Sequence, residues 1–173
     1  AFLNSDAFII ASLIAVPLMI AYSLWFKGWP LFGNIVIALI LGLTFIFAGA
    51  AFGNLWGLIV PALLAFGFTL LRELVKDIAD LEGDRSAGLR TFPVLAGEKK
   101  SAILAIILSA MIGAGALIPY FLGFYGLKYL IILIFGIEFP LFYVLLTLVK
   151  SPTITNCKRI AQILKACIIV GLL

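Results

Sequence analysis

The 173-residue chain contains no histidine, and only 12% of its residues are charged. The missing histidine excludes Ser-His-Asp and Cys-His catalysis, and with them histidine-ligated zinc and haem. Soluble domains usually carry about a quarter charged residues, so the scarcity of charge argues against an ordinary globular core. Because 65% of the residues are hydrophobic, the chain is predicted to be a membrane protein.

Cysteine is also scarce, and the spacing of Cys157 and Cys167 matches no metal-ligand or redox motif. Both fall at or inside an apolar segment, where cysteine usually behaves as a small hydrophobic side chain. The net charge of +4 would be compatible with nucleic-acid binding, but the basic residues lie between apolar segments. Membrane topology explains them better, so no nucleic-acid partner is expected.

What the chain does contain is long apolar runs, which predict an all-α, polytopic transmembrane helical bundle. Five runs are long enough to span a membrane, and a sixth is cut short. They are Ala7–Leu24, Leu31–Ala51, Leu55–Leu71, Ser101–Leu122 and Tyr129–Val149, followed by Ile160–Leu173. The chain does not begin with Met, and its last run is short, so we expect a fragment of a larger bundle. We expect one membrane domain, residues 1–173, and no soluble domain.

Basic residues are distributed unevenly between the loops. Alternating the spans across the membrane places ten of them on one side and only Lys128 on the other. The ten are Lys27, Arg72, Lys76, Arg85, Arg90, Lys99, Lys100, Lys150, Lys158 and Arg159. Such an excess predicts that their side faces the cytoplasm, with the protein as a multi-pass component of the cell membrane.

Twelve of the twenty charged residues fall between Arg72 and Lys100, directly after the third apolar run. The first part of this segment is predicted to continue the helix of that run. Four carboxylates then recur at i, i+4, i+7 and i+11, within a stripe about 60° wide. They are Glu73, Asp77, Asp80 and Asp84. Glu82 points to the opposite side of the helix.

Four like charges on one helical face repel one another, by a few tenths of a kcal/mol or more per neighbouring pair. A bound divalent cation would explain the arrangement, and oxygen ligands beside basic residues indicate Mg²⁺ carrying phosphate or diphosphate. An exposed helix end without a ligand is the plainer alternative. Downstream, Gly88 marks a turn, Arg90 is placed to reach back, and Pro93 disfavours helix at Phe92. This loop would either cover the site or merely connect two helices.

Other candidate residues lie at the ends or in the middle of spans. Tyr22 and Lys27 fall near the predicted cytoplasmic boundary, and Asn34 lies just inside the next span. Interfacial anchoring explains Tyr22 and Lys27 equally well. Glu138 falls nearer the middle of its span, where an ionisable group is a functional candidate by default. Pairing within the bundle would also explain Glu138, and we assign it no role.

The segment RELVKDIADLEGDRSAGLRTFPVLAG resembles the second aspartate-rich motif of the UbiA superfamily of intramembrane prenyltransferases, and YSLWFK followed by GWPLFGN resembles its Tyr/Lys motif. The resemblance covers essentially the whole chain and is nearest to the archaeal branch that makes ether lipids. It implies a Mg²⁺-dependent transferase, with geranylgeranyl diphosphate as donor and a hydroxyl of geranylgeranylglyceryl phosphate as acceptor. Another member would use an aromatic acceptor, such as 4-hydroxybenzoate or another quinone precursor, with the same donor chemistry.

The resemblance also implies residue roles. Asp77, Asp80 and Asp84 would hold Mg²⁺ on the diphosphate, with Glu73 nearby. Tyr22 would line the reacting end of the isoprenyl chain, and Asn34 is a further substrate-binding candidate. Basic residues would stabilise the departing diphosphate. They are Lys27, Arg72, Lys76, Arg85 and Arg90.

The family's other aspartate-rich motif, of the kind Asn-x-x-x-Asp-x-x-x-Asp, has no match here, because the only acidic residue before Glu73 is Asp6. We therefore expect that helices carrying this motif precede the chain and that the chain alone holds half of a metal site. A cation-coupled membrane transporter is the main alternative from another class, although transporter sites usually lie near the midplane at a repeat interface. A CDP-alcohol phosphotransferase would need a later Gly-x-x-x-Asp-x-x-x-Asp motif, which the sequence lacks.

Overall fold

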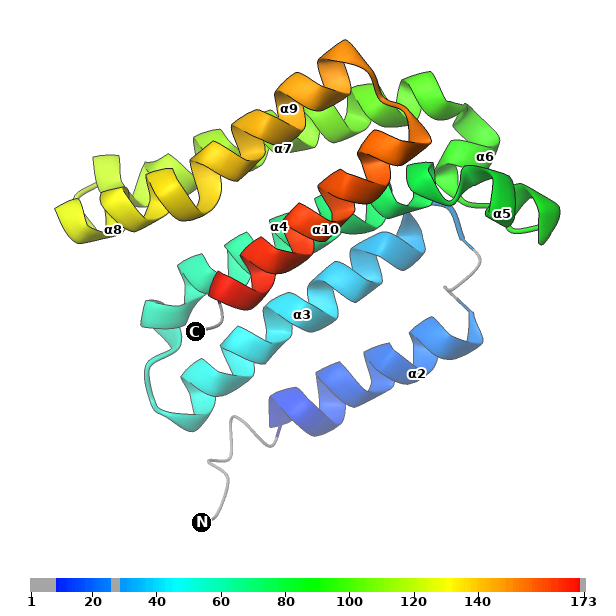
Figure 1. Ribbon diagram of the computed structural model, residues 1–173. Coiled ribbons are helices and arrows are strands. Elements are labelled where there is room, and N and C mark those ends of the chain that lie inside the picture. Colours follow the sequence, from blue (N-terminus) through cyan, green and yellow to red (C-terminus); the bar gives the residue numbers. More distant parts are fainter. Residues whose placement is uncertain (1–8, 26–28, 172–173) are drawn as a thin grey trace. The chain divides into compact units, whose positions relative to one another are not determined.

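A computed structural model describes residues 9–25 and 29–171 of the chain. Every regular element within these two ranges is a helix, which confirms the all-α prediction (Figure 1). The chain divides into two compact units, Ala1–Leu70 and Leu71–Leu173. Helix α4, Leu55–Ala79, runs through the boundary between them. The single membrane domain stays a prediction.

The first unit is built from apolar helices that pack in sequence. A π-helical turn, Ile10–Ala15, leads into α2, Val16–Leu24, and both pack against α3, Phe32–Ala51. Helices α3 and α4 then approach closely at Gly42, where a Cβ atom would lie 3.1 Å from the Ala62 carbonyl oxygen. Small residues at such crossings let membrane helices pack backbone to backbone, since lipid supplies no hydrophobic drive between them.

The second unit begins with the end of α4 and continues through seven further elements. They are α5, Leu81–Ser86; α6, Phe92–Ala96; α7, Glu98–Phe121; α8, Leu127–Leu133; the π-helical turn η3, Ile134–Glu138; α9, Phe139–Lys150; and α10, Ile154–Gly171. Helix α7 packs against α9, and α10 packs against α9 as well. The buried face of α7 carries mostly small residues, which permits close contact. They are Ser101, Ala102, Ala105, Ser109, Gly113 and Ala116.

Four helical segments are long and apolar enough to cross a membrane: Phe32–Ala51, Leu55–Ala79, Glu98–Phe121 and Leu127–Lys150. They confirm four of the five predicted full spans. The predicted run Ala7–Leu24 is represented by a shorter apolar helix, Leu13–Leu24, and its first two residues lie outside the described ranges. Helix α10 begins at Ile154 rather than at the predicted Ile160, and its basic residues make it more polar than the four spans.

Candidate functional site

The candidate carboxylates occupy the end of α4 and the short helix α5. Glu73 and Asp77 lie one turn apart on α4, which confirms that the third span continues into the charged segment. Helix α4 ends at Ala79, however, and Asp80 separates it from α5 with φ −99° and ψ 7°. The Asp80 amide donates to the Lys76 carbonyl at 2.9 Å, and the Asp84 amide donates to the Asp80 carbonyl at 2.8 Å. The carboxylates therefore follow successive turns, but on two helices rather than on one.

Burial differs along this set. Glu73 is only 8% exposed, Asp77 and Asp84 are half-buried, and Asp80 is exposed. Glu73 forms an ion pair with the guanidinium of Arg72. This pair already supplies Glu73 with a positively charged partner, and the predicted place of Glu73 beside the metal ligands stays a prediction. The Arg72 Nε atom is buried and has no hydrogen-bond partner in the described structure.

A Schellman motif closes α5 and turns the chain back. Gly88 has φ +70°, a left-handed conformation that glycine adopts without strain. Its amide donates to the Arg85 carbonyl at 3.2 Å, and the Leu89 amide donates to the Asp84 carbonyl at 2.9 Å. The predicted turn at Gly88 is confirmed, and it directs the following residues toward Asp84.

Thr91 makes a contact that the sequence analysis did not identify. Its hydroxyl donates to Asp84 Oδ2 at 3.0 Å, which ties the loop after α5 to one of the candidate metal ligands. Residues 84 and 91 have the i, i+7 spacing of a helix, but α5 ends at Ser86, so the turn at Gly88 and not a continuous helix brings them together. The only clue was the position of Thr91 at the end of the Gly-Leu-Arg-Thr run. The next expectation was wrong: Phe92 is helical, and Pro93 fits the first turn of α6, where a missing amide hydrogen costs little.

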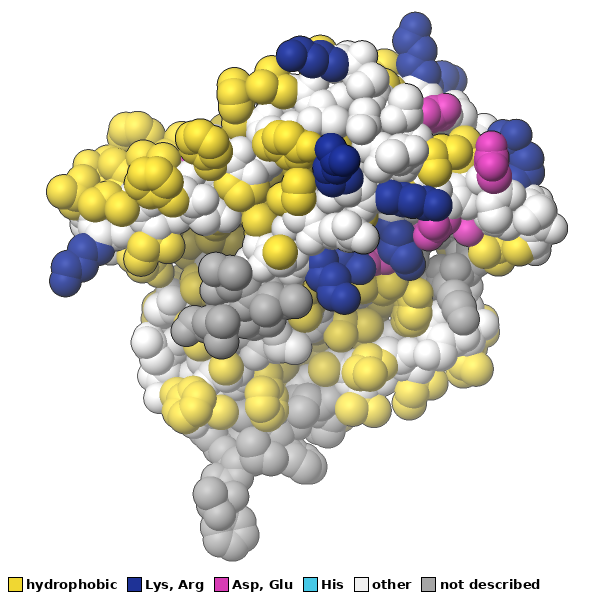
Figure 2. All heavy atoms as spheres, viewed as in Figure 1, with side chains coloured by type: hydrophobic (Ala, Val, Ile, Leu, Met, Phe, Trp, Pro, Cys, Tyr) yellow, Lys and Arg dark blue, Asp and Glu magenta, His cyan; other side chains and the backbone are white. Residues whose placement is uncertain are grey.

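Basic side chains lie on the same segment as the carboxylates. Lys76, Arg85 and Arg90 are all exposed, on α4, on α5 and in the loop before α6. In the second unit, acidic and basic side chains gather over the α5–α6 end, whereas hydrophobic side chains cover the α8 end (Figure 2). Within the described part of the chain, no ion pair joins Arg90 to a carboxylate. The prediction that Arg90 reaches back toward the site therefore stays a prediction.

The remaining predicted site residues belong to the first unit. Tyr22 lies on α2 and Asn34 on α3, and both are half-buried. Lys27 lies outside the described residues. Asp77, Asp80 and the other acidic candidates belong to the second unit. A site that joins the two sets stays a prediction.

The carboxylates suit Mg²⁺ by their chemistry, since hard cations prefer oxygen ligands. Within residues 9–25 and 29–171, no three acidic or cysteine side chains converge into a metal-binding cluster. Mg²⁺ usually keeps several waters and takes one or two protein carboxylates together with substrate phosphates, so its binding does not require a complete protein cage. Asp77, Asp80 and Asp84 remain the predicted ligands.

Glu138 lies away from this region, at the end of η3 within the Leu127–Lys150 span. A Cβ atom on Gly113 of α7 would come within 3.0 Å of Glu138 Oε2. Glu138 Oε1 is buried without a hydrogen-bond partner in the structure as described. Nearby on α8, the Tyr129 hydroxyl donates to the Ala116 carbonyl at 2.7 Å. The glycine thus makes room for a polar side chain inside an apolar helix pair.

Comparison with known proteins places this chain in a family. Residues 1–165 match the UbiA prenyltransferase family. The chain belongs to this family. The predicted resemblance is thereby confirmed, and the family together with the four apolar spans identifies an integral membrane protein.

Individual relatives agree with the assignment. Digeranylgeranylglyceryl phosphate synthase of Natronomonas pharaonis is 40% identical over 117 residues, which are 67% of this chain and 42% of that protein. The synthase of Pyrococcus furiosus is 38% identical over 136 residues, covering 79% of this chain and 48% of its own. A solved structure from work on digeranylgeranylglyceryl phosphate synthase in membranes has a TM-score of 0.83 at 28% identity and covers 99% of this chain and 60% of that chain. The chain thus spans less than half the length of these two curated relatives.

Proposed function

We propose that the protein carrying this chain transfers a geranylgeranyl group from its diphosphate to a hydroxyl of geranylgeranylglyceryl phosphate, with Mg²⁺. The observation that carries the proposal is the grouping of aspartates and basic residues at one end of an apolar membrane helix, α4. Membership of the UbiA prenyltransferase family supports the reaction class. The names of the relatives support the choice of donor and acceptor.

The donor's allylic C–O bond breaks in this reaction, so negative charge develops on the departing diphosphate. Bound Mg²⁺ would supply part of the opposing charge, held by Asp77, Asp80 and Asp84. Lys76 and Arg85 lie on the same two helices and would add positive charge without a covalent step. The unpaired Nε donor of Arg72 is suited to a phosphate oxygen.

The carbon left by the diphosphate requires surroundings that exclude water. The apolar spans that precede and follow the charged segment would provide them. The acceptor hydroxyl oxygen then forms the new C–O bond and releases its proton. Tyr22, Asn34 and Lys27 are proposed to contribute to this site from the chain that precedes α4.

A hydroxylated aromatic acceptor is the second candidate, because the donor half of the reaction would be unchanged. A cation-coupled transporter is less well supported, since the clustered aspartates lie at and beyond the end of a span rather than near its middle.

The test uses the full-length protein in detergent or bilayers, with geranylgeranyl diphosphate and geranylgeranylglyceryl phosphate, with and without Mg²⁺. We expect Mg²⁺-dependent release of diphosphate together with an ether product. Release that requires an aromatic acceptor instead would move the proposal to the second candidate. No release with any acceptor would contradict prenyl transfer.

We also propose that the charged segment faces the cytoplasm, because the basic residues favour that orientation. Ser86 is exposed at the end of α5, so Ser86→Cys offers a labelling site. A membrane-impermeant maleimide should label it in inverted vesicles and not in intact cells. If the Ser86→Cys protein is labelled in intact cells and not in inverted vesicles, the charged segment faces the outside and the proposed orientation is wrong.

A further inference from the structure

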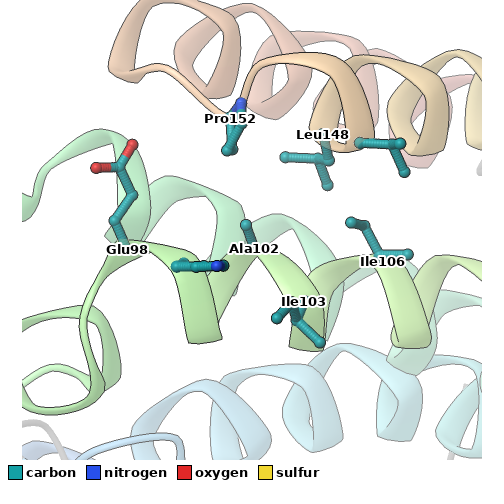
Figure 3. A pocket seen from close by; sticks show the side chains of 8 residues that line it. Glu98, Ala102, Ile103, Ile106, Leu148 and Pro152 are labelled. Atoms are coloured by element: carbon teal, nitrogen blue, oxygen red, sulfur yellow. The ribbon is translucent and has the colours of Figure 1, made fainter.

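A groove of about 540 Å³ opens in the second unit, between the first turns of α7 and the last turn of α9. Ile106 and Leu148 point toward each other across it, and Pro152 lies opposite Ala102 (Figure 3). The groove exists because α9 ends at Lys150, where Ser151 turns extended and Pro152 follows, while α7 continues as a helix to Glu98. It contains none of the proposed catalytic residues.

The two ends of the groove differ in chemistry. Ile103, Ile106 and Leu148 lie within candidate membrane spans and give it an apolar floor. Glu98 and Lys99 line its mouth, at the first residues of α7. An amphipathic ligand would therefore fit the groove, because its hydrocarbon chain would lie against the spans and its polar group would lie at their ends.

Charge at the mouth favours an anion. Lys99 lines the groove, and Lys100 and Lys150 are exposed beside it, at the adjoining ends of α7 and α9. Glu98 is the one acidic residue among residues 98–100 and 148–152. Neither Lys99 nor Lys150 has an ion-pair or hydrogen-bond partner in the part of the chain that the structure describes. Lys158 and Arg159 add further positive charge near the start of α10, which packs on α9.

The size of the groove argues against a protein helix as its occupant. One turn of a helix about 10 Å across already fills about 400 Å³, so a docking helix would insert little more than a turn. A volume of 540 Å³ instead lies within the range of about 300–1,000 Å³ that holds small molecules. Basic pockets between helices at a membrane face are suited to anionic lipid headgroups.

We propose that this groove binds one anionic phospholipid of the surrounding membrane, with a hydrocarbon chain against Ile106 and Leu148 and the phosphate between Lys99 and Lys150. The site is separate from the proposed prenyl-transfer site, and its test does not depend on catalysis. The negative charge of Glu98 repels the phosphate, so neutralising Glu98 should strengthen lipid binding, whereas neutralising a lysine should weaken it.

The experiment is native mass spectrometry of the full-length protein, loaded with dioleoyl phosphatidylglycerol or with dioleoyl phosphatidylcholine. The wild type should retain phosphatidylglycerol in preference to phosphatidylcholine. Lys99→Gln and Lys150→Gln should each weaken retention of phosphatidylglycerol about fivefold, and the double variant about thirtyfold. Glu98→Gln should strengthen it about fivefold. Lys128→Gln, at the start of α8, is the matched charge control and should change nothing.

A second pair of variants tests the apolar floor. Ile106→Trp fills the groove and should weaken retention, whereas Ile107→Trp, which does not line the groove, should not. Lys99 and Lys150 are exposed, so their substitution leaves the packing intact and decides the question even if Ile106→Trp fails to fold.

Equal retention of both lipids, an unchanged double lysine variant, or an equal loss with Lys128→Gln would overturn the proposal. Glycerol phosphate provides the remaining comparison, because it carries the headgroup chemistry without chains. Displacement of phosphatidylglycerol by glycerol phosphate at equal concentration would indicate a site for free phosphate and would also overturn the lipid assignment. A lack of displacement is the expected result.

Discussion

Two regions of the second unit differ in how tightly they pack. The segment from the end of α4 to α6 carries exposed or half-buried aspartates, one of which accepts a hydrogen bond from Thr91. Helix α7, in contrast, packs on α9 through small buried residues. Aspartates that are proposed to bind a metal must remain accessible to water and substrate, and tight packing would prevent this. Helices in lipid gain stability chiefly from close contact with one another. The small-residue face of α7 must therefore stay packed against α9 for the bundle to be stable. Substitutions in the two regions should therefore separate activity from stability.

The largest effect should come from the carboxylates. Asp80→Asn combined with Asp84→Asn in the full-length protein should lower prenyl transfer by at least about 100-fold, the scale on which single electrostatic contacts to developing charge act. The thermal unfolding temperature should change little, because both residues lie outside the packed helix pair. Glu82→Gln is the matched control, since Glu82 is exposed on the same short helix. Unchanged transfer in the double variant would refute the metal site.

The packed region should respond in the opposite way. Gly113→Leu should destabilise the protein by about 1–3 kcal/mol, because the new side chain must displace the Glu138 carboxylate. Gly115 lies on the same helix, and a Cβ atom there would meet nothing within 4 Å. Gly115→Leu should therefore leave the unfolding transition in place. Equal destabilisation by the two substitutions, measured by thermal unfolding in detergent, would mean that close packing at Gly113 does not matter.

Cys157 is a buried thiol on α10 that is affected by the charge of Glu98. Burial and, secondarily, the charge of Glu98 raise the pKa of its thiol to about 11. Only the thiolate reacts, so in a Cys167→Ser background the labelling rate should rise about tenfold per pH unit between pH 8 and pH 10. The rate is measured by stopping the labelling reaction at a series of times at each pH. A rate that levels off near pH 9 would show an ordinary thiol pKa.

The smallest effect is expected at the hydrogen bond that the Thr91 hydroxyl donates to Asp84, across the loop after α5. Thr91→Val should reduce kcat/KM by about fivefold, from the loss of about 1 kcal/mol. Thr91→Ser keeps the hydroxyl and should restore the rate. The dependence on Mg²⁺ concentration should shift in the valine variant alone, and failure of serine to rescue would make the role of Thr91 one of packing.

Much of the fold could be predicted because its signals are local. Apolar length predicts four of the spans, and the helix predicted to continue from Leu55 into the charged segment does so as far as Ala79. The break at Asp80 was missed, since the i, i+4 spacing of the carboxylates is the same on one helix or on two consecutive ones. The helical start at Phe92 was not predicted, because proline usually disfavours helix at the residue before it, whereas here Pro93 lies in the first turn of α6, where proline is tolerated.

The sequence by itself determined the membrane-spanning character, the glycine turn at residue 88 and the positions of the aspartates, because each depends on residues within a few positions of one another. Only the tertiary structure decided that Thr91 binds Asp84, that Gly113 faces Glu138, and that α7 and α9 leave a groove beside Lys99. These contacts join residues that do not lie on one continuous helix. They form only after turns and helix packing bring distant parts of the chain together.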